Sequence, residues 1–243
     1  MTDPTPKGPL SRRDLLRLGL TAGAASLATA CGWQGGPLIP ALRGASHLND
    51  WVGENVLLSR HRLARQFPES ARTPERLFPA YSITRPLPQL ADPAAWVLEV
   101  GGEVRKPLRL TLEMLQALPR VRYTIEHHCV EGWSAIATWT GVPVSSVIAL
   151  AEPTDQAKYL RFDSFDRGYS NGWDRESALH PQTILAYAFN DRPLTPAHGA
   201  PLRLYSPVKL GYKLTKYLTK ITFTREKPGG YWEDQGYPWL GGT

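Results

Sequence analysis

Hydrophobic and polar positions along the chain predict many short strands separated by helices of one or two turns. Apolar runs bounded by glycine or proline predict strands at 96–100, 120–125, 159–165, 183–189, 202–205 and 217–224. Thr111 is expected to begin a short helix that ends at Pro119, and a second short helix is expected at 143–150. This mixture predicts an α+β fold that is mostly β.

Other segments have the pattern of irregular chain. Because proline fixes φ and lacks an N–H, the six prolines within 67–93 predict an extended arm over a surface. Residues 49–65 favour a short helix with Leu57, Leu58 and Leu63 on one side. Residues 166–174 are expected to form a polar loop, and 229–243 an irregular aromatic tail.

The N-terminus is typical of a targeting segment. Arg12 and Arg13 precede a modest apolar stretch from Leu18 to Ala30, which resembles a twin-arginine export signal. Cys31 follows Ala30 in a sequence similar to a lipoprotein processing box, so we weigh a lipid anchor at Cys31 against ordinary cleavage near Ala30. The expected organisation is an export signal at 1–30, a tether at 31–50 and one domain at 51–243, with the arm at 51–95. An exported protein of this kind acts in the periplasm or otherwise outside the cytoplasmic membrane.

Composition narrows the class of protein. The chain has 243 residues, a net charge of +6 and a mean hydropathy of −0.31, which argues against a multispan membrane protein. The positive charges are scattered and form no nucleic-acid-binding signature, so we expect no nucleic-acid partner. Two cysteines are too few for a disulfide framework, and no Cys-x-x-Cys-His haem motif is present.

Cys129 is the main candidate for chemistry. It follows a predicted strand and stands beside His127 and His128. A thiolate is both a soft metal ligand and a nucleophile. Neighbouring residues of a strand face opposite sides, so at most one of the two histidines is expected to share a pocket with Cys129. A zinc site would need further ligands at usable spacing, and none is evident, so we expect no zinc.

The sequence around Cys129 carries a recognisable set of motifs. Cys129-Val130-Glu131-Gly132-Trp133-Ser134 and the segment 139–144 resemble the cofactor-ligand segment of the sulfite oxidase family of molybdenum enzymes. The resemblance continues in the same order through segments 177–183, 186–190, 198–204, 210–216, 229–233 and 236–237. It covers the chain from about Phe78 to the end. The resemblance implies a sulfite-oxidase-type molybdopterin-binding fold with a single domain.

Membership of that family implies a molybdenum ion held by one pyranopterin dithiolene and one protein cysteine. Cys129 occupies the ligand position, which makes it the expected metal ligand and catalytic residue. The resemblance implies that Arg203, Lys213 and Lys216 meet the cofactor phosphate, since a guanidinium or an ammonium suits an anion. The expected cofactor-binding residues are Tyr81, Ser82, His128, Cys129, Ser164, His198, Arg203, Lys213, Thr215 and Lys216. Pro79 replaces an Asn that relatives often carry in the arm, so one side-chain amide contact is lost.

The substrate side is less distinctive. The candidates to frame an oxyanion or a sulfoxide are His128 and five residues of the polar loop, namely Arg167, Tyr169, Asn171, Trp173 and Arg175, although a solvated loop has the same composition. The resemblance is to the small exported branch of the family, which includes sulfoxide-reductase catalytic subunits that pair with a membrane haem protein. It implies oxygen-atom transfer, with reduction of a sulfoxide or similar small oxo substrate. Electrons are expected to pass singly to or from a separate carrier, such as a cytochrome or a membrane haem subunit.

Three alternatives stay open on the residues alone. One is a sulfite-oxidising enzyme of the same family. Another is a cysteine hydrolase, in which His128 activates Cys129 and Glu131 or Asp163 orients the histidine, although residues 128 and 129 face opposite sides of a strand. The third is a non-catalytic lipoprotein that binds a ligand through the aromatic tail, where Trp232, Tyr237 and Trp239 provide apolar surface.

Overall fold

The computed structural model describes residues 62–90 and 92–243, together with Gly44, Ala45, Leu48, Trp51 and Val52. The predicted export signal, Cys31 and most of the predicted tether lie outside the described residues. Most of the helix predicted at 49–65 also does, but Trp51 and Val52 are helical and residues 62–65 are not. Residues 49–243 form one compact unit. Within the described part of the chain, we find no helix with the length and apolar character needed to cross a bilayer.

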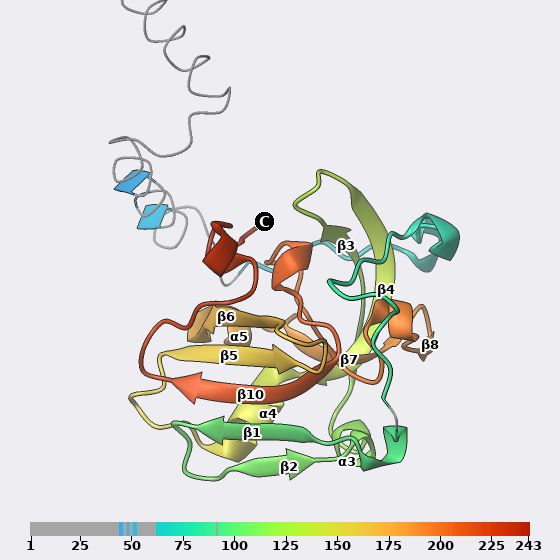
Figure 1. Cartoon of the computed structure of the whole chain (residues 1–243). Helices are drawn as coiled ribbons and strands as arrows, with labels where there is room; N and C mark the ends of the chain where they lie inside the picture. The colour runs from blue at the N-terminus through green and yellow to red at the C-terminus, as the bar shows by residue number, and fades with distance from the viewer. Residues whose placement is uncertain (1–43, 46–47, 49–50, 53–61, 91) are drawn as a thin grey trace, which may run out of the picture. The chain divides into compact units, whose positions relative to one another are not determined.

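One of the two sheets of this unit is mixed (Figure 1). Its strands are β1 (Leu98–Gly102), β2 (Leu108–Leu110), β5 (Tyr159–Ser164), β6 (Ser170–Asp174) and β10 (Leu218–Thr224). Their order is β2-β1-β10-β5-β6. The pairing of β1 with β10 is parallel, while the other neighbours in this order are antiparallel. The last strand, β10, therefore lies between the first strand, β1, and β5.

The second sheet carries the hairpin that holds Cys129. It is formed by β3 (Val121–His128), β4 (Ser134–Pro143), β7 (Ile184–Phe189) and β8 (Arg192–Pro193), with β9 (Arg203–Tyr205) also paired to β7. β3 and β4 pair antiparallel from Val121 opposite Gly141 to His128 opposite Ser134. A bulge at Thr140 and Gly141 shifts the register of β4 against β7. At this bulge β4 and β7 approach each other closely, because a Cβ on Gly141 would lie 2.1 Å from the carbonyl oxygen of Leu185.

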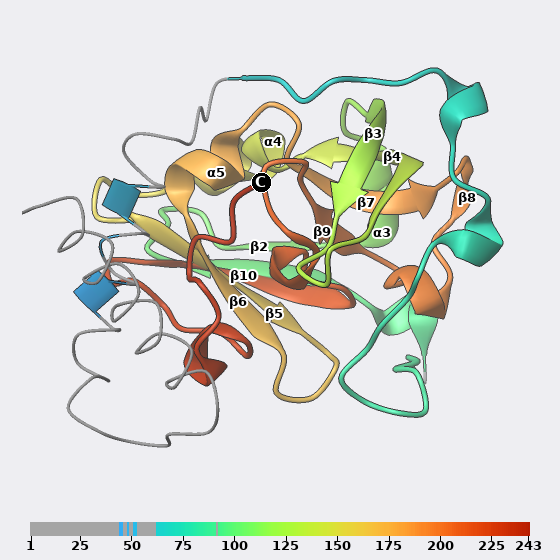
Figure 2. The same cartoon turned by 90° about the horizontal axis from the view of Figure 1, so that it is seen from above.

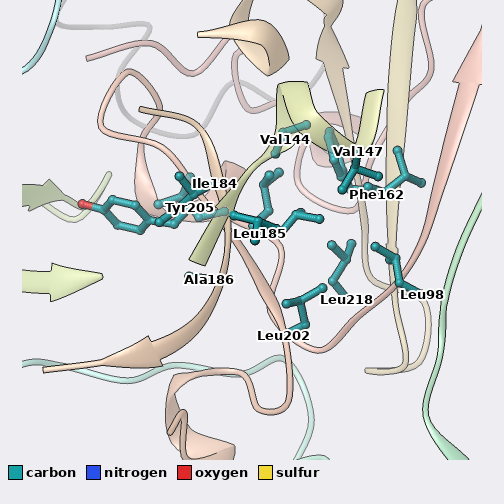
Figure 3. Close-up of a cluster of buried hydrophobic side chains, with 14 of the residues drawn as sticks. Leu98, Val144, Val147, Phe162, Ile184, Leu185, Ala186, Leu202, Tyr205 and Leu218 are labelled. Carbon is teal, nitrogen blue, oxygen red and sulfur yellow. The ribbon is translucent and has the colours of Figure 1, made fainter. Parts of the chain in front are cut away.

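Short helices fill the space around the sheets. They are α3 (Leu112–Gln116), α4 (Val144–Ala151) and α5 (Arg175–Leu179), and 3-10 turns occur at Glu69–Ala71, Glu75–Leu77, Pro93–Ala95, Pro196–His198, Gly211–Lys213 and Glu233–Gln235. Thr111 caps α3, because its Oγ1 accepts a hydrogen bond from the N–H of Met114 at 3.2 Å. Figure 3 shows the core, where Val144 and Val147 of α4 pack near Phe162 of β5 and Leu185 of β7.

The predicted strands and the two predicted short helices are confirmed, with bounds that shift by a few residues. The ten-residue strand β4 and the helix α5 carried no prediction. The polar loop predicted at 166–174 is wrong in its second half, because residues 170–174 form the fully buried strand β6. Distant partners make burial of their polar groups tolerable: Asn171 Nδ2 donates to Tyr212 O at 3.1 Å, and Asp174 accepts from Lys209 Nζ at 3.2 Å.

From residue 62 onward the described part of the proline-rich arm is extended, as predicted, and is interrupted by short 3-10 turns (Figure 2). Ala64 exchanges two hydrogen bonds with the side-chain amide of Gln182, at 2.7 and 3.1 Å. Further along, Phe67 N donates to Thr124 O on β3, and Thr73 N donates to Ile136 O on β4, both at 2.8 Å. The arm is therefore fastened to the second sheet before it reaches the cavity described next.

Candidate active site

Cys129 begins the loop that connects β3 to β4. The loop is closed by two backbone hydrogen bonds, from Cys129 N to Trp133 O at 3.0 Å and from Gly132 N to Cys129 O at 3.1 Å. Gly132 has φ +87°, a value that glycine adopts without strain. The tight turn holds the half-buried thiol at the end of the hairpin.

Cys129 lines a cavity of about 430 Å³. Its walls include the arm from Phe78 to Ile83, the Cys129 loop, the ends of β5 and β9, and the segments 211–217 and 231–237. These parts lie far apart in the sequence, so the cavity exists only in the folded chain. Its size and its mixed apolar and polar lining are those of a site for a cofactor or a small molecule.

The sulfur of Cys129 is protonated in its present surroundings. Burial raises the pKa of this thiol, and the nearby Glu131 adds to the effect. Sγ lies 3.8 Å from Glu131 Oε2, which also accepts a hydrogen bond from Trp133 Nε1 at 3.1 Å. An isolated thiol of this kind is a poor nucleophile. A bound metal cation would favour the thiolate instead.

A cluster of cations forms another part of the cavity wall. Arg203 is buried, with its Cζ 4.7 Å from the centre of the Trp139 ring and its Nη1 donating to His198 O at 3.1 Å. Its Nε is buried and has no hydrogen-bond partner within the described chain. Burial lowers the pKa of Arg203 to about 10. A buried guanidinium with an unused donor is a site prepared for an anion.

Lys216 adds to this positive region, and His198 lies beside it as a neutral side chain near pH 7. Lys216 Nζ donates to Tyr81 O at 2.6 Å and to Ala197 O at 2.8 Å. Burial, and then the charge of Arg203, lower the pKa of Lys216 to about 7 and that of His198 to about 4. Among the described residues, neither Lys216 nor Arg203 forms an ion pair with a carboxylate. An anionic group bound here would offset charges that the protein itself leaves uncompensated.

Comparison with known proteins assigns this architecture. Residues 84–232 match the family model described as "Oxidoreductase molybdopterin binding domain". The chain belongs to this family. It is therefore a molybdopterin oxidoreductase domain, and its fold is the mostly β, sulfite-oxidase-type fold that the sequence predicted.

Individual relatives agree with the family assignment. The chain is 39% identical, over 96% of its length and 88% of the relative's, to a "Putative protein-methionine-sulfoxide reductase subunit YedZ1" from Azospira oryzae. It is 34% identical over 57% of its length to "Protein-methionine-sulfoxide reductase catalytic subunit MsrP" from Campylobacter jejuni, and spans 52% of that protein. The sulfane dehydrogenase SoxCD from Paracoccus pantotrophus shares the fold, with a TM-score of 0.55 at 23% identity over 58% of this chain and 41% of that chain.

The cavity of this molybdopterin oxidoreductase fits the cofactor that its family implies. A molybdenum–pterin group brings an anionic phosphate and a soft metal centre. The unpaired Nε of the buried Arg203, together with Lys216, fits the phosphate. The half-buried sulfur of Cys129 fits the metal, because a thiolate is the ligand type that soft metals prefer.

Most of the predicted cofactor-binding residues meet at the cavity. Its lining includes Tyr81, Ser82, Cys129, Ser164, His198, Arg203 and Lys216. The arm contributes to the site although Pro79 stands where relatives often carry Asn, and Pro79 itself lies in the lining. The structure thus brings together residues that lie up to 135 positions apart, as the bond between Tyr81 and Lys216 illustrates.

Three other predicted cofactor residues do not line the cavity. His128 lies on the opposite face of β3, where it borders a separate cavity with Glu126, while His127 faces the cofactor cavity. Lys213 is buried behind the wall, where Nζ donates to Gly172 O at 2.7 Å and pairs with Glu233. Thr215 is also buried, and its Oγ1 accepts from Asn171 Nδ2 at 3.1 Å. His128 points away from the cavity because neighbouring residues of a strand face opposite sides, and Lys213 and Thr215 are held in the interior by hydrogen bonds.

Of the predicted substrate residues, Tyr169 lines the cavity and the others do not. Arg167 is exposed outside the cavity lining, and Trp173 is fully buried, with its Nε1 donating to Lys213 O at 3.0 Å. Arg175 donates to Ala157 O at 3.2 Å and does not line the cavity. Asp163 pairs with Arg161 at 2.7 Å and is likewise absent from the lining. With His128 and Asp163 both turned away, the catalytic arrangement of a cysteine hydrolase is not formed.

Several lining residues were missed as site residues. The sequence carried a signal for His127, because strand alternation allows only one histidine of the pair to face Cys129. His127 is buried, and burial lowers its pKa to about 3, so it is neutral near pH 7. Phe78 packs against His127 and Trp133 with ring centres 5.4 and 5.9 Å away. Asp166 and Tyr231 were also missed, whereas Trp232 and Tyr237 line the cavity after being considered only as the ligand surface of a non-catalytic protein.

Proposed function

We propose that this molybdopterin oxidoreductase reduces sulfoxides by oxygen-atom transfer. The observation that carries the proposal is the cavity that Cys129 lines together with the buried Arg203 and the partly buried Lys216. The similarity to methionine-sulfoxide reductase subunits supports the sulfoxide as substrate. In the net reaction, a sulfoxide takes up two protons and two electrons and yields a thioether and water. The S–O bond breaks, sulfur is reduced by two electrons and the oxygen leaves as water.

The residues of the chain have distinct tasks in this proposal. When bound, the molybdenum–pterin group supplies a two-electron redox centre that accepts the oxygen atom. Cys129 holds the metal from the end of the β3–β4 hairpin, and Arg203 and Lys216 hold the cofactor phosphate. The aromatic side chains of Phe78 and Trp133, 5.9 Å apart, exclude water from one side of the cavity.

The electron source is proposed to be a separate carrier. The relative from Azospira oryzae is named as a subunit, which supports a partner protein for this chain as well. A membrane haem subunit or a cytochrome would deliver two electrons one at a time, while the protons come from solvent. The substrate would enter through the open side of the cavity.

Export by the twin-arginine route, with or without a lipid anchor at Cys31, remains part of the proposal. The Arg12-Arg13 pair and the following apolar stretch support it. Cell fractionation of the variant in which Arg12 and Arg13 are both changed to Lys tests the route, and retention in the cytoplasm is expected. Mass spectrometry of the mature N-terminus, with Cys31→Ser as the control, tests the anchor. Normal export of the double-Lys variant would contradict the proposed route.

The experiment that tests the activity starts from protein matured in a molybdenum-replete host. Metal and pterin analysis is expected to give about one equivalent of each. Reduced viologen then serves as the electron donor in a screen of dialkyl sulfoxides, N-oxides and sulfite, with sulfite oxidation followed by an artificial acceptor. Sulfoxide-dependent viologen oxidation is the expected result. Loaded protein that oxidises sulfite and leaves sulfoxides unchanged would overturn the proposal.

A further inference from the structure

One part of the cavity lining consists of aromatic rings that the proposed cofactor contacts do not use. Three of these rings belong to the C-terminal tail: Tyr231, Trp232 and Tyr237. Trp232 lies between the other two, with ring centres 5.0 Å from each. The row extends to Tyr212, whose ring centre is 5.3 Å from that of Tyr237. We call Tyr231, Trp232 and Tyr237 the aromatic wall.

The aromatic wall is held from behind by the segment 209–213. Lys209 Nζ donates to Leu240 O at 2.7 Å, and Tyr212 Oη donates to Pro238 O at 2.6 Å. Between them, Lys213 forms an ion pair with Glu233, and both side chains are almost completely buried. Glu233 directly follows Trp232 in the sequence. The ion pair therefore fixes the backbone next to the central ring of the wall.

Lys213 belongs to a segment that also faces the cavity. Gly211, Leu214 and Lys216 line the cavity, while Lys213 turns away from it toward the tail. A Cβ on Gly211 would lie 3.1 Å from His127 Nε2, so this segment approaches the Cys129 hairpin closely. The segment 209–216 thus joins the reaction cavity on one side to the aromatic wall on the other.

The chemistry of the wall favours one kind of ligand. Its three side chains are uncharged, and their ring faces suit apolar groups and sulfur, which contacts aromatic rings favourably. A compact oxyanion such as sulfite would gain no ion pair from the wall. A sulfoxide whose sulfur carries alkyl groups would place those groups against the rings and turn its oxygen inward.

We propose that the aromatic wall determines specificity for dialkyl sulfoxides, with Trp232 and Tyr237 as the contacting residues and the Lys213–Glu233 ion pair as the positioning element. The inference rests on the proposed sulfoxide reduction, which it extends by naming the residues that select the substrate.

The first test removes the rings of the wall. In molybdenum-loaded Trp232→Ala and Tyr237→Ala, we expect the KM for N-acetyl-methionine sulfoxide to rise at least tenfold, with kcat within about threefold of wild type. Tyr159→Leu is the matched control, because Tyr159 touches the tail residue Trp239 from β5, at 5.7 Å between ring centres, but does not line the cavity. An unchanged KM in both Ala variants would overturn the inference and leave the proposed function intact.

A binding measurement keeps the two proposals separable. Titration of the loaded protein with the corresponding thioether, N-acetyl-methionine, is expected to change the tryptophan fluorescence of wild type and not of Trp232→Phe. This readout needs no turnover. Thioether binding at the wall without any sulfoxide reduction would contradict the proposed function alone. Absence of a fluorescence change in wild type would contradict the inference.

The second test addresses the ion pair. Glu233→Gln leaves the Lys213 ammonium buried without its partner, so we expect faster hydrogen exchange of residues 229–240 and a KM increase similar to that of Trp232→Ala. Lys213→Met combined with Glu233→Met removes both charges and is expected to recover at least half of the exchange protection and KM. A double variant that loses bound pterin with the tail still protected would assign Lys213 to the cofactor and overturn its role here. If Glu233→Gln does not fold, the double variant and the ring variants still decide the proposal.

Discussion

Lys216 Nζ donates a hydrogen bond to the backbone carbonyl of Tyr81, at 2.6 Å. This bond joins the proline-rich arm to a cation that also lines the cofactor cavity. A second hydrogen bond lies nearby in the sequence of the arm, in which Thr84 Oγ1 donates to Asp166 Oδ1 at 2.6 Å. The arm closes one side of the cavity through these two bonds, so its stability is coupled to residues of the site.

Thr84→Val tests the hydrogen bond from Thr84 to Asp166. The substitution leaves the buried Asp166 without one donor, so the free energy of unfolding is expected to fall by about 1–3 kcal/mol. Urea denaturation measures the loss, and hydrogen exchange of residues 78–90 is expected to show it locally. The control is Thr224→Val, which removes an exposed hydroxyl bonded to Glu226 O and is expected to change stability by less than about 0.5 kcal/mol. Equal losses of unfolding free energy in the two variants would contradict a stabilising role of the Thr84–Asp166 hydrogen bond.

Cys129→Ser tests the proposed metal ligand. Because loss of even an outer partner of a metal site typically costs about 10–100-fold in affinity or activity, loss of the ligand is expected to reduce activity at least 100-fold. Bound molybdenum, measured by elemental analysis, is expected to fall with it. The half-buried position predicts a change in unfolding free energy below about 1 kcal/mol for the apoprotein. Full molybdenum content with full activity would exclude Cys129 as the ligand.

Arg203→Met separates cofactor binding from folding. The guanidinium is buried without a carboxylate partner among the described residues, so its replacement by an apolar side chain is expected to leave the apoprotein at least as stable as wild type. Pterin content is expected to fall at least tenfold, because the phosphate loses its buried donor. Thermal denaturation of the apoprotein and pterin analysis of the matured protein measure the two effects. A strongly destabilised apoprotein with normal pterin content would show that Arg203 serves folding and not cofactor binding.

The pH dependence of apoprotein stability reports on Lys216. Its pKa falls from an ordinary 10.5 to about 7 because the side chain is buried. Between these values the unfolded chain binds one proton more than the folded chain, so this residue makes the free energy of unfolding rise with pH from about 7 to 10.5. Lys216→Met is expected to remove the contribution of this one proton from the slope of unfolding free energy against pH, as measured by urea denaturation across this range. Lys106→Met, which removes an exposed lysine, is the control for the change in net charge.

Gly199→Ala tests the close packing beneath Lys216. Gly199 has φ +96°, and a Cβ there would lie 2.8 Å from Lys216 Cβ. Backbone strain and this clash together predict a loss of about 1–3 kcal/mol in unfolding free energy and a lower pterin content. Gly168→Ala is the matched control, because Gly168 has φ +80° and open space at the Cβ position. The difference between the two variants measures the contact with Lys216, and no difference would show that the contact is unimportant.

The sequence by itself determined the features that depend on neighbouring residues. Alternation and turn residues predicted the strand that leads into Cys129, and the cap at Thr111 was predicted from its residue type and the apolar positions that follow. The motif around Cys129 indicated the family, which the comparisons show. These features are local because a strand or a capped helix is specified within a few consecutive positions.

Only the tertiary structure decided which long side chains enter the cavity. Lys213 and Lys216 have the same chemistry and lie three residues apart, yet Lys213 pairs with Glu233 and Gly172 O while Lys216 lines the cavity. The polar residues of β6 are buried because Tyr212 and Lys209 supply partners from about 40 positions away. A flexible ammonium group is directed by acceptors that are distant in the chain, and local periodicity carries no information about where those acceptors lie.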